Sequence, residues 1–372
     1  MRFCAVFRHY PKDTPGGAEF QSYLIERELA RRGHDVHYVA YQSGTTQTTT
    51  DEGISLHRLQ SDVDPADAPK LVLEEIKSIN PDYVYLRNFS DLPLADHLDD
   101  WIDGEIIFNI SHDRQCLRLR NNPRETMTIS NIYQWVNEPW RLFKKRLFQL
   151  PDYRFAQTEY QQDLLKENFG LTSSYIGNGH PIPEDIADTR NPPTILWLAS
   201  LKSWKQPMKF IEIAEACEDL NCQFWLVGRP ANTELMNTID EHLDNLSNIA
   251  YKGGCGIKES NTCIRDSDIF VNTSVKEGFP NTFIQSWLRK TPVVSLNVDP
   301  DNLLQKYDIG TSADGDFEKM VADLRCMIEN TSYRNDLGVN ARSYAKSNHS
   351  MSAVVSRIEC SLGLEEQITK GS

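Results

Sequence analysis

The chain has 372 residues, of which 40% are hydrophobic and 25% charged, a balance typical of a globular protein long enough for two domains. Its formal net charge of -14 argues against nonspecific binding of nucleic acid, which needs a basic surface to neutralise phosphates. An anionic ligand remains compatible with this charge wherever cations or backbone N–H groups gather locally.

In the first half of the chain, short apolar runs alternate with helical patterns. The clearest helix, residues 18–33, ends in Arg31, Arg32 and Gly33, two cations and a glycine that favour a helix C-terminus. The predicted strands are 2–7, 34–41, 81–86, 105–110, 152–157 and 173–177. This alternation indicates a mostly parallel sheet with helices on both faces.

The segment "NGHPIPEDIADTRNPP" (178–193) holds four prolines and little apolar material, which is typical of an interdomain linker. After it the alternation resumes, with predicted helices at 205–217 and 315–330 and predicted strands at 194–199, 222–228, 268–274 and 291–297. We therefore predict an α/β fold with two doubly wound, Rossmann-like domains that face each other across a cleft. In such sheets ligands bind beyond the carboxyl ends of the strands.

One string, "EGFPNTFIQSW" (277–287), combines features of an anion site. A strand leads into it, and the helix that follows carries its apolar residues, Phe283, Ile284, Trp287 and Leu288, on one face. Free N–H groups at the start of that helix favour a phosphate, and Glu277 just before it is placed to accept hydrogen bonds from ligand hydroxyls. An anion joined to a polyhydroxyl group describes a sugar nucleotide. The alternative is a Gly-Pro turn with an acidic residue favoured by the helix dipole.

In their order along the chain, several segments resemble the family-4 retaining glycosyltransferases (glycosyltransferase group 1), which have the two-domain GT-B fold. The string at 277 fits the sugar-donor motif of this family, in which a Glu is followed after seven residues by a second Glu; here the second position is Gln285. The other matching segments are "PGGAE" (15–19), "SHD" (111–113), "SLKSWKQP" (200–207), "LVGRP" (226–230) and "TPVVSLN" (291–297).

This resemblance implies roles for individual residues. Glu277 holds sugar hydroxyls, Lys205 contacts the diphosphate, and His112 lies near the reacting sugar or the acceptor, so these three are the predicted catalytic residues. The predicted sugar-donor-binding residues are Gly16, Gly17, Ser200, Lys202, Lys205, Gly228, Arg229, Glu277, Gly278, Phe279, Pro280, Asn281, Thr282 and Gln285.

Two departures from the family pattern concern the sugar donor. Ser200 stands where the family has an arginine, and Lys202, two residues further on, is a candidate replacement. Gln285 can accept a hydrogen bond from a ribose hydroxyl but carries no charge, which costs about 1 kcal/mol relative to a carboxylate.

Plainer interpretations stay open for two of these features. His112 follows a predicted strand and fits a residue that caps the strand or bonds to Asp113. Gly16 and Gly17 also suit an ordinary loop after the first strand.

The resemblance also divides the chain by role. It implies an acceptor-binding domain at 1–178, a linker at 179–193 and a nucleotide-sugar-binding domain at 194–351, with a C-terminal helix at about 352–372 that returns to the first domain.

We predict no metal and no cofactor beyond the nucleotide-sugar substrate. No His/Cys cluster has metal spacing. The D-x-D strings at Asp62/Asp64, Asp266/Asp268, Asp299/Asp301 and Asp314/Asp316 are expected by chance in an acidic chain.

The segment "WRLFKKRLF" (140–148) predicts a helix with Leu142, Phe143 and Leu147 facing inward. Its mixture of aromatic and basic residues also suits a helix on an anionic membrane, which would fit a lipid-linked acceptor.

Cysteine usage and the chain start predict the compartment. None of the eight cysteines forms a C-x-x-C pair, and free thiols in a reducing compartment are expected. The apolar part of "MRFCAVFRHYP" is too short for a signal peptide, and no run of about 18 apolar residues appears. We therefore expect a cytoplasmic protein, with peripheral contact to the inner face of the membrane as an alternative.

The predicted function is a retaining, metal-independent glycosyltransferase that moves a sugar from a nucleotide-diphosphate sugar to a hydroxyl of a glycan, lipid-linked or small-molecule acceptor. Two alternatives stay open. A nucleotide-sugar epimerase would act without an acceptor, and a degenerate nucleotide-sugar-binding protein would explain Ser200 and Gln285.

Overall fold

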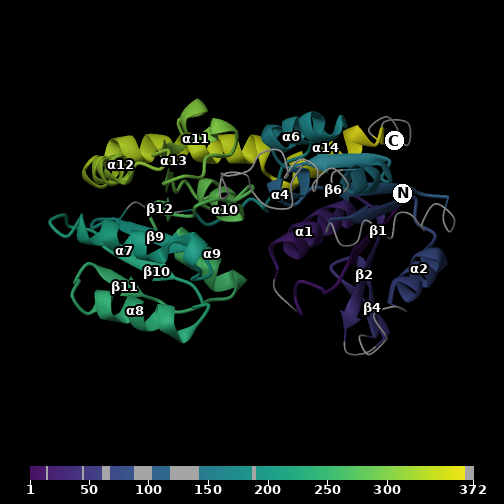
Figure 1. The fold of residues 1–372 in the computed structure, drawn as a ribbon, viewed down its shortest axis with the longest axis horizontal. Helices are drawn as coiled ribbons and strands as arrows, with labels where there is room; N and C mark the ends of the chain where they lie inside the picture. Colours follow the sequence, from purple (N-terminus) through teal and green to yellow (C-terminus); the bar gives the residue numbers. More distant parts are fainter. Residues whose placement is uncertain are drawn as a thin grey trace, which may run out of the picture. The chain divides into compact units, whose positions relative to one another are not determined.

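The computed structural model describes residues 1–13, 16–43, 46–60, 68–87, 103–117, 142–186 and 190–364. It divides the chain into two compact units, of which the first comprises Met1–Gly179 with Met351–Ser372 and the second His180–Ser350. The segment predicted as a linker, 179–193, is therefore grouped largely with the second unit, and the chain returns to the first unit with its last helix (Figure 1).

The first unit is built on an eight-stranded sheet of order β3-β4-β2-β1-β5-β6-β7-β8. All neighbours pair in parallel except β3 and β4, which form an antiparallel pair at one edge. The strands are β1 (Arg2–Phe7), β2 (Asp35–Ser43), β3 (Gln47–Asp51), β4 (Ile54–Gln60), β5 (Tyr83–Leu86), β6 (Glu105–Asn109), β7 (Tyr153–Ala156) and β8 (Ser174–Tyr175).

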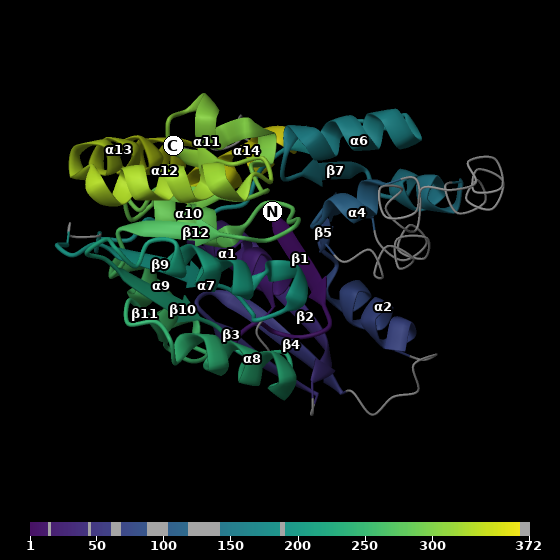
Figure 2. The same cartoon turned by 60° about the vertical axis from the view of Figure 1, so that its left-hand side comes forward.

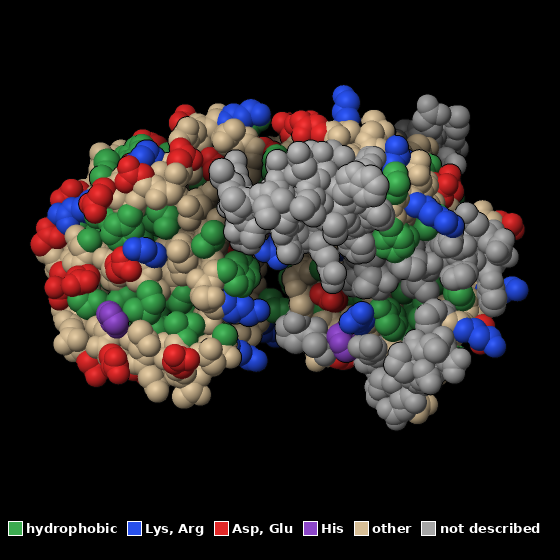
Figure 3. Space-filling model, viewed as in Figure 1, with side chains coloured by type: hydrophobic (Ala, Val, Ile, Leu, Met, Phe, Trp, Pro, Cys, Tyr) green, Lys and Arg blue, Asp and Glu red, His purple; other side chains and the backbone are tan. Residues whose placement is uncertain are grey.

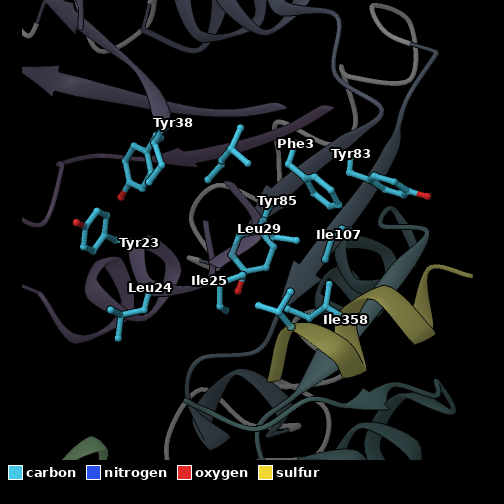
Figure 4. Close-up of a cluster of buried hydrophobic side chains, with 14 of the residues drawn as sticks. Phe3, Tyr23, Leu24, Ile25, Leu29, Tyr38, Tyr83, Tyr85, Ile107 and Ile358 are labelled. Carbon is cyan, nitrogen blue, oxygen red and sulfur yellow. The ribbon is translucent and has the colours of Figure 1, made fainter. Parts of the chain in front are cut away.

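Helices cover both faces of this sheet. The described ones are α1 (Gly17–Arg31), α2 (Ala68–Ile79), α4 (Asp113–Cys116), a helix over residues 142–149, α6 (Glu159–Phe169) and α14 (Met351–Ser361). α1 and α14 pack on one face, where side chains such as Leu29, Tyr85 and Ile358 form a continuous apolar cluster (Figure 4). α2, α6 and the helix at 142–149 bury their apolar residues against the other face.

The second unit has a six-stranded, fully parallel sheet of order β11-β10-β9-β12-β13-β14. Its strands are β9 (Thr194–Leu198), β10 (Gln223–Val227), β11 (Ile249–Tyr251), β12 (Ile269–Asn272), β13 (Val293–Ser295) and β14 (Gly310–Ser312). The chain runs outward in one direction from β9 to β11 and in the other from β12 to β14. The strand order therefore reverses between β9 and β12, and such a switch point is where open α/β sheets bind ligands.

Helices cover both faces of the second sheet as well. They are η3 (Ser203–Lys205), α7 (Pro207–Glu215), α8 (Thr233–Leu243), α9 (Ile257–Arg265), α10 (Asn281–Trp287), η4 (Pro300–Asn302), α11 (Leu303–Lys306), α12 (Phe317–Glu329) and α13 (Thr331–Asn348). One core cluster joins α7, α8 and α12 to the sheet, and another joins α9, α10, α11 and α13 to it. α12 and α13 lie side by side in both views of the fold (Figure 2).

Most predicted elements are found in the structure with ends that differ by a few residues, but the C-terminal helix predicted at about 352–372 ends at Ser361. The structure adds elements for which the sequence predicted no range, namely the strands β3, β4, β11 and β14 and the helices α2, α4, α6, α8, α9, α11 and α13. Acidic and basic side chains are interspersed over the visible face of the second unit, so the net negative charge does not form a single patch there (Figure 3).

The orientation predicted for the helix at 140–148 is wrong for two of its residues. Leu142 and Phe143 are 54% and 47% exposed, whereas Leu147 is buried as predicted. Lys144 is buried instead, because its Nζ donates to the carbonyl oxygens of Arg114, Gln115 and Leu117 at the end of α4. Lys144, which bonds the free carbonyl groups at a helix end, therefore points inward, where the apolar pattern had placed Leu142 and Phe143.

Candidate functional site

Two loops meet at the switch point of the second sheet. The loop after β9 spans residues 199–206 and contains η3, and the loop after β12 spans residues 273–280 and leads into α10. Since β9 and β12 are adjacent and parallel, their carboxyl ends lie at the same edge of the sheet. Lys205 in the first loop and Glu277 in the second, far apart in the sequence, are therefore brought together.

Lys205 and Glu277 form an ion pair at this edge. Lys205 Nζ lies 2.6 Å from Glu277 Oε2, and the two side chains are 12% and 15% exposed. The other carboxylate oxygen, Oε1, accepts hydrogen bonds from Asn272 Nδ2 at 2.9 Å and from Ser274 Oγ at 2.6 Å. The carboxylate is thus held by three groups, yet both members of the pair keep a surface that a ligand can reach.

The two loops are also joined through their backbones. Val275 N donates to Trp204 O at 2.9 Å, and the buried Thr273 hydroxyl lies 2.8 Å from Lys205 O and 2.9 Å from Gln206 O. Thr273 Oγ1 in turn accepts from the Trp197 indole N–H at 2.9 Å. The contacts of Thr273 are buried or half-buried, so they fix the backbone that carries Lys205 relative to the strand that precedes Glu277.

The helix after Glu277 begins at Asn281 and ends at Trp287, and its predicted apolar face is confirmed, since Phe283, Ile284, Trp287 and Leu288 are fully buried. Residues 278, 281, 282 and 285 are half-buried.

Phe279 and Pro280, however, are buried in the unit's core. The Phe279 ring lies 4.8 Å from the His349 ring and 6.1 Å from that of Trp287, centroid to centroid. Any contact of Phe279 or Pro280 with a ligand is therefore limited to their backbone atoms.

The other predicted residues of the second unit lie around these loops without joining the pair. A Cβ on Gly228 would come 1.8 Å from Ala199 O, so only glycine lets the loop after β10 pass so close to the loop after β9. The exposed Arg229 lies over Gly254, whose missing side chain makes room for its stem.

Ser200 and Lys202 are exposed. Lys202 lines a surface hollow of about 450 Å³ together with Trp204, Asn232 and Glu234. The lysine considered as a replacement for the family's arginine thus lies at this hollow.

The predicted residues of the first unit sit at helix starts. Gly16 precedes α1 and Gly17 is its first residue; a Cβ on Gly16 would come 2.2 Å from Glu19 Oε2. His112 caps α4, since its Nδ1 accepts from Arg114 N at 3.1 Å. His112 therefore caps the start of a helix and not the end of a strand, and Asp113 accepts from Gln161 Nε2 at 3.0 Å.

Sequence reasoning missed Asn272, Thr273 and Ser274, which hold the ion pair. The signal for them was the polar triplet "NTS" at the carboxyl end of an otherwise apolar strand, where side chains face the ligand edge of a parallel sheet. Trp204 was also missed.

The D-x-D strings that the structure describes serve local structure. Asp268 accepts from the backbone N–H groups of Arg190 and Thr194, and Asp299 from that of Leu304. Asp316 caps α12. Asp62 and Asp64 lie outside the described residues. Across the described ranges, no group of three or more His, Cys, Asp or Glu side chains is arranged to hold a metal ion.

Two further findings bear on the sequence predictions. All eight cysteines are free, and Cys4, Cys116, Cys217 and Cys222 are buried. Among the helices whose residues are described, none combines the length and the apolar character needed to cross a bilayer.

Comparison with protein families decides what kind of domain carries this site. Residues 192–330, which include both loops, match the family model described as glycosyl transferases group 1. This match covers most of the second unit, which is therefore similar to the glycosyltransferase group 1 domains. No curated protein matches the chain.

Solved structures with this fold include several glycosyltransferases. HepE of Anabaena, crystallised with UDP and glucose, aligns with 98% of this chain and 99% of its own at a TM-score of 0.73 and 15% identity. Sucrose-phosphate synthase of Thermosynechococcus elongatus aligns over 100% of both chains at a TM-score of 0.76 and 13% identity. A glycosyltransferase of Rickettsia africae aligns over 100% and 99% at a TM-score of 0.74 and 17% identity.

The domain match and the shared fold confirm two predictions, the GT-B fold class and the glycosyltransferase enzyme class. HepE has also been crystallised with UDP-glucose.

Proposed function

We propose that this glycosyltransferase transfers a sugar from a nucleotide-diphosphate sugar to an acceptor hydroxyl with retention of anomeric configuration and without a metal. The Lys205–Glu277 pair carries the proposal, because it sets a cation for a diphosphate beside an acceptor for sugar hydroxyls at the switch point of the matched domain.

The contacts of the pair leave room for both roles. An ammonium group has three N–H donors, and the contact with Glu277 uses one of them, so phosphate oxygens can take others. A carboxylate oxygen has two lone pairs, so Glu277 Oε2 can accept from a sugar hydroxyl while Asn272 and Ser274 hold Oε1. Glu277 would then orient the sugar while it keeps its hydrogen bonds to Asn272 and Ser274.

During transfer, negative charge grows on the departing diphosphate as its bond to the anomeric carbon breaks. Lys205 stabilises that charge in a partly water-excluded position, where a fixed cation acts more strongly than in bulk water. Because Ser200 offers no charge, Lys205 bears a larger share of this work than it would beside an arginine. Retention requires the acceptor hydroxyl to attack from the face that the diphosphate leaves.

The remaining roles rest on the sequence resemblance. We propose that the first unit binds the acceptor, with His112 near the reacting sugar, and that Gly16, Gly17, Gly228, Arg229 and the start of α10 contribute to binding the sugar donor. We further propose a cytoplasmic protein that needs no cofactor, with peripheral contact to the membrane as an alternative. The exposure of Leu142 and Phe143 supports such contact.

The test has two stages, a binding screen and a transfer assay. Nucleoside diphosphates and nucleotide sugars are screened for thermal stabilisation, since a ligand that binds only the folded state raises the apparent stability. The best sugar donor is then incubated with a panel of acceptors in the presence and absence of chelator. We expect transfer that survives the chelator, and a requirement for Mn²⁺ would contradict the metal-free mechanism.

A degenerate sugar-nucleotide-binding protein is the second candidate, favoured by Ser200 at the arginine position. Tight binding of nucleotide sugar without transfer to any acceptor would support it. Conversion of the sugar donor in the absence of acceptor would indicate an epimerase instead.

A further inference from the structure

Trp204 is a large aromatic residue in an unusual setting. It lies in the short turn η3 immediately before Lys205, and it is 44% exposed although tryptophan side chains are mostly buried. Packing alone therefore does not account for a tryptophan at this position.

The ring of Trp204 contacts Lys205, the lysine of the candidate site. Lys205 Nζ lies over the Trp204 ring, 4.3 Å from the centroid. The same ammonium lies 2.6 Å from Glu277 Oε2, so it is held between the negative face of an indole and a carboxylate.

The backbone fixes where the ring stands. The carbonyl of Trp204 accepts from Val275 N, and the carbonyl of Lys205 lies 2.8 Å from the Thr273 hydroxyl. Both partners belong to the segment between β12 and Glu277, so the turn that presents the ring is tied to the segment that presents the carboxylate. Lysine, in contrast, has a flexible four-carbon stem and swings into solvent unless something holds its head.

We propose that Trp204 is a positioning residue for Lys205, whose ammonium it holds at the edge of the sheet where the diphosphate of the sugar donor binds. This inference rests on the proposed function. It predicts that the ring acts through the lysine and affects the sugar donor, whereas a ring that stacked on an acceptor sugar would affect the acceptor.

Three substitutions of Trp204 distinguish the effect of its aromatic face from the effect of its volume. Trp204→Phe keeps an aromatic face, Trp204→Leu keeps apolar volume without one, and Trp204→Ala removes both. We expect the leucine and alanine variants to lose about tenfold in kcat/KM for the sugar donor and in affinity for UDP, which corresponds to about 1.4 kcal/mol. The phenylalanine variant should stay within about threefold, and KM for the acceptor should not change.

The coupling to Lys205 is the decisive measurement. UDP binding by calorimetry is compared for wild type, Trp204→Leu, Lys205→Ala and the double variant. If the ring acts through the lysine, Trp204→Leu has no further effect in the Lys205→Ala background. An equal loss in both backgrounds, or wild-type behaviour of Trp204→Leu, overturns the proposal.

A matched control is Tyr307→Leu, which changes another exposed aromatic of the second unit that has a lysine over its ring, Lys306 at 5.5 Å. This variant should bind UDP like wild type. If the proposed function is wrong, Lys205→Ala itself leaves UDP binding unchanged. If only the positioning role is wrong, Lys205→Ala weakens UDP binding but Trp204→Leu does not.

Discussion

The two units treat charged side chains near the ligand edge of their sheets in different ways. In the second unit Lys205 and Glu277 neutralise each other and stay partly exposed. In the first unit Arg87 follows β5 and is fully buried, and its guanidinium donates to two neutral groups, Asn178 Oδ1 at 2.9 Å and the Tyr85 hydroxyl at 3.3 Å.

Two further titratable groups of the first unit, Glu26 and Lys144, are also buried. Both carboxylate oxygens of Glu26 lack a hydrogen-bond partner, and burial raises its pKa to about 8. Burial also lowers the pKa of Lys144, to about 8. A paired charge that solvent can reach is able to exchange its partner for a ligand, whereas a buried titratable group mainly makes stability depend on pH. We therefore expect substitutions at the pair in the second unit to affect ligand binding, and substitutions at the buried groups of the first unit to affect the pH dependence of stability.

The largest expected effect tests the pair itself. Glu277→Ala and Lys205→Ala should each lower kcat by about 10²–10³-fold, the range found when one preorganised electrostatic group is removed. Steady-state kinetics with the sugar donor identified by the thermal screen measures this effect. Melting temperatures near that of wild type would show that the fold is intact, and wild-type turnover in either variant would remove the assigned role.

The next effect concerns the stability of the first unit. Because the folded-state pKa of Glu26, about 8, lies above its ordinary value of 4.5, its contribution to stability is full below pH 4.5 and is lost as the pH rises through 8. Glu26→Gln keeps the shape without the charge and should raise the unfolding free energy at pH 7.5 by about 4 kcal/mol.

Urea unfolding of this variant from pH 5 to 8 provides the check, with Glu19→Gln, a half-buried position of the same helix, as the control. A pH slope as steep in Glu26→Gln as in wild type would show that Glu26 does not carry the charge penalty.

In the second unit, the buried His180 is expected to affect the pH dependence of stability in the opposite direction. His180 is buried, and desolvation, with Arg289 and His349 nearby, lowers its pKa to about 3. Since the unfolded chain binds this proton first, the stability present above pH 6.5 is lost as the pH falls towards 3.

The expected loss between pH 6.5 and pH 5 is about 2 kcal/mol, and it should be smaller in His180→Asn. Unfolding followed by a probe in the second unit tests this, with the exposed His242→Asn as control. Equal acid sensitivity of wild type and His180→Asn would contradict the assignment.

The smallest expected effect tests the contact between the two loops that Thr273 makes. Thr273→Val removes one hydroxyl that contacts the backbone of Lys205 and accepts from Trp197. Loss of a buried hydrogen bond costs about 1 kcal/mol, so stability should fall by that amount and turnover by a few-fold. Ser267→Ala removes another buried hydroxyl, which donates to Ile264 O, and should lower stability without changing turnover. A turnover loss of equal size in both variants would count against a specific role for Thr273.

Local patterns in the sequence predicted much of the second unit. Its strands are short apolar runs buried on both sides, and the string at 277 combines an apolar helix face with an acidic, glycine-containing entry, so the buried stripe from Phe283 to Leu288 and the position of Glu277 could be inferred from neighbours in the chain. The antiparallel pair β3–β4 was not predicted, because the threonine-rich β3 is exposed and has no apolar alternation.

By itself the sequence determined the alternation of strands and helices, because this alternation follows from short-range periodicity, and the acidic entry to the helix at Glu277; Lys205 was indicated by the resemblance to a known family. Only the tertiary structure decided that Lys205 meets Glu277, that Trp204 lies beneath that lysine, and that Lys144 and Glu26 are buried. The reason is physical: these contacts depend on which strands become neighbours and on which buried charges find partners, and neither is encoded in any local stretch of the chain.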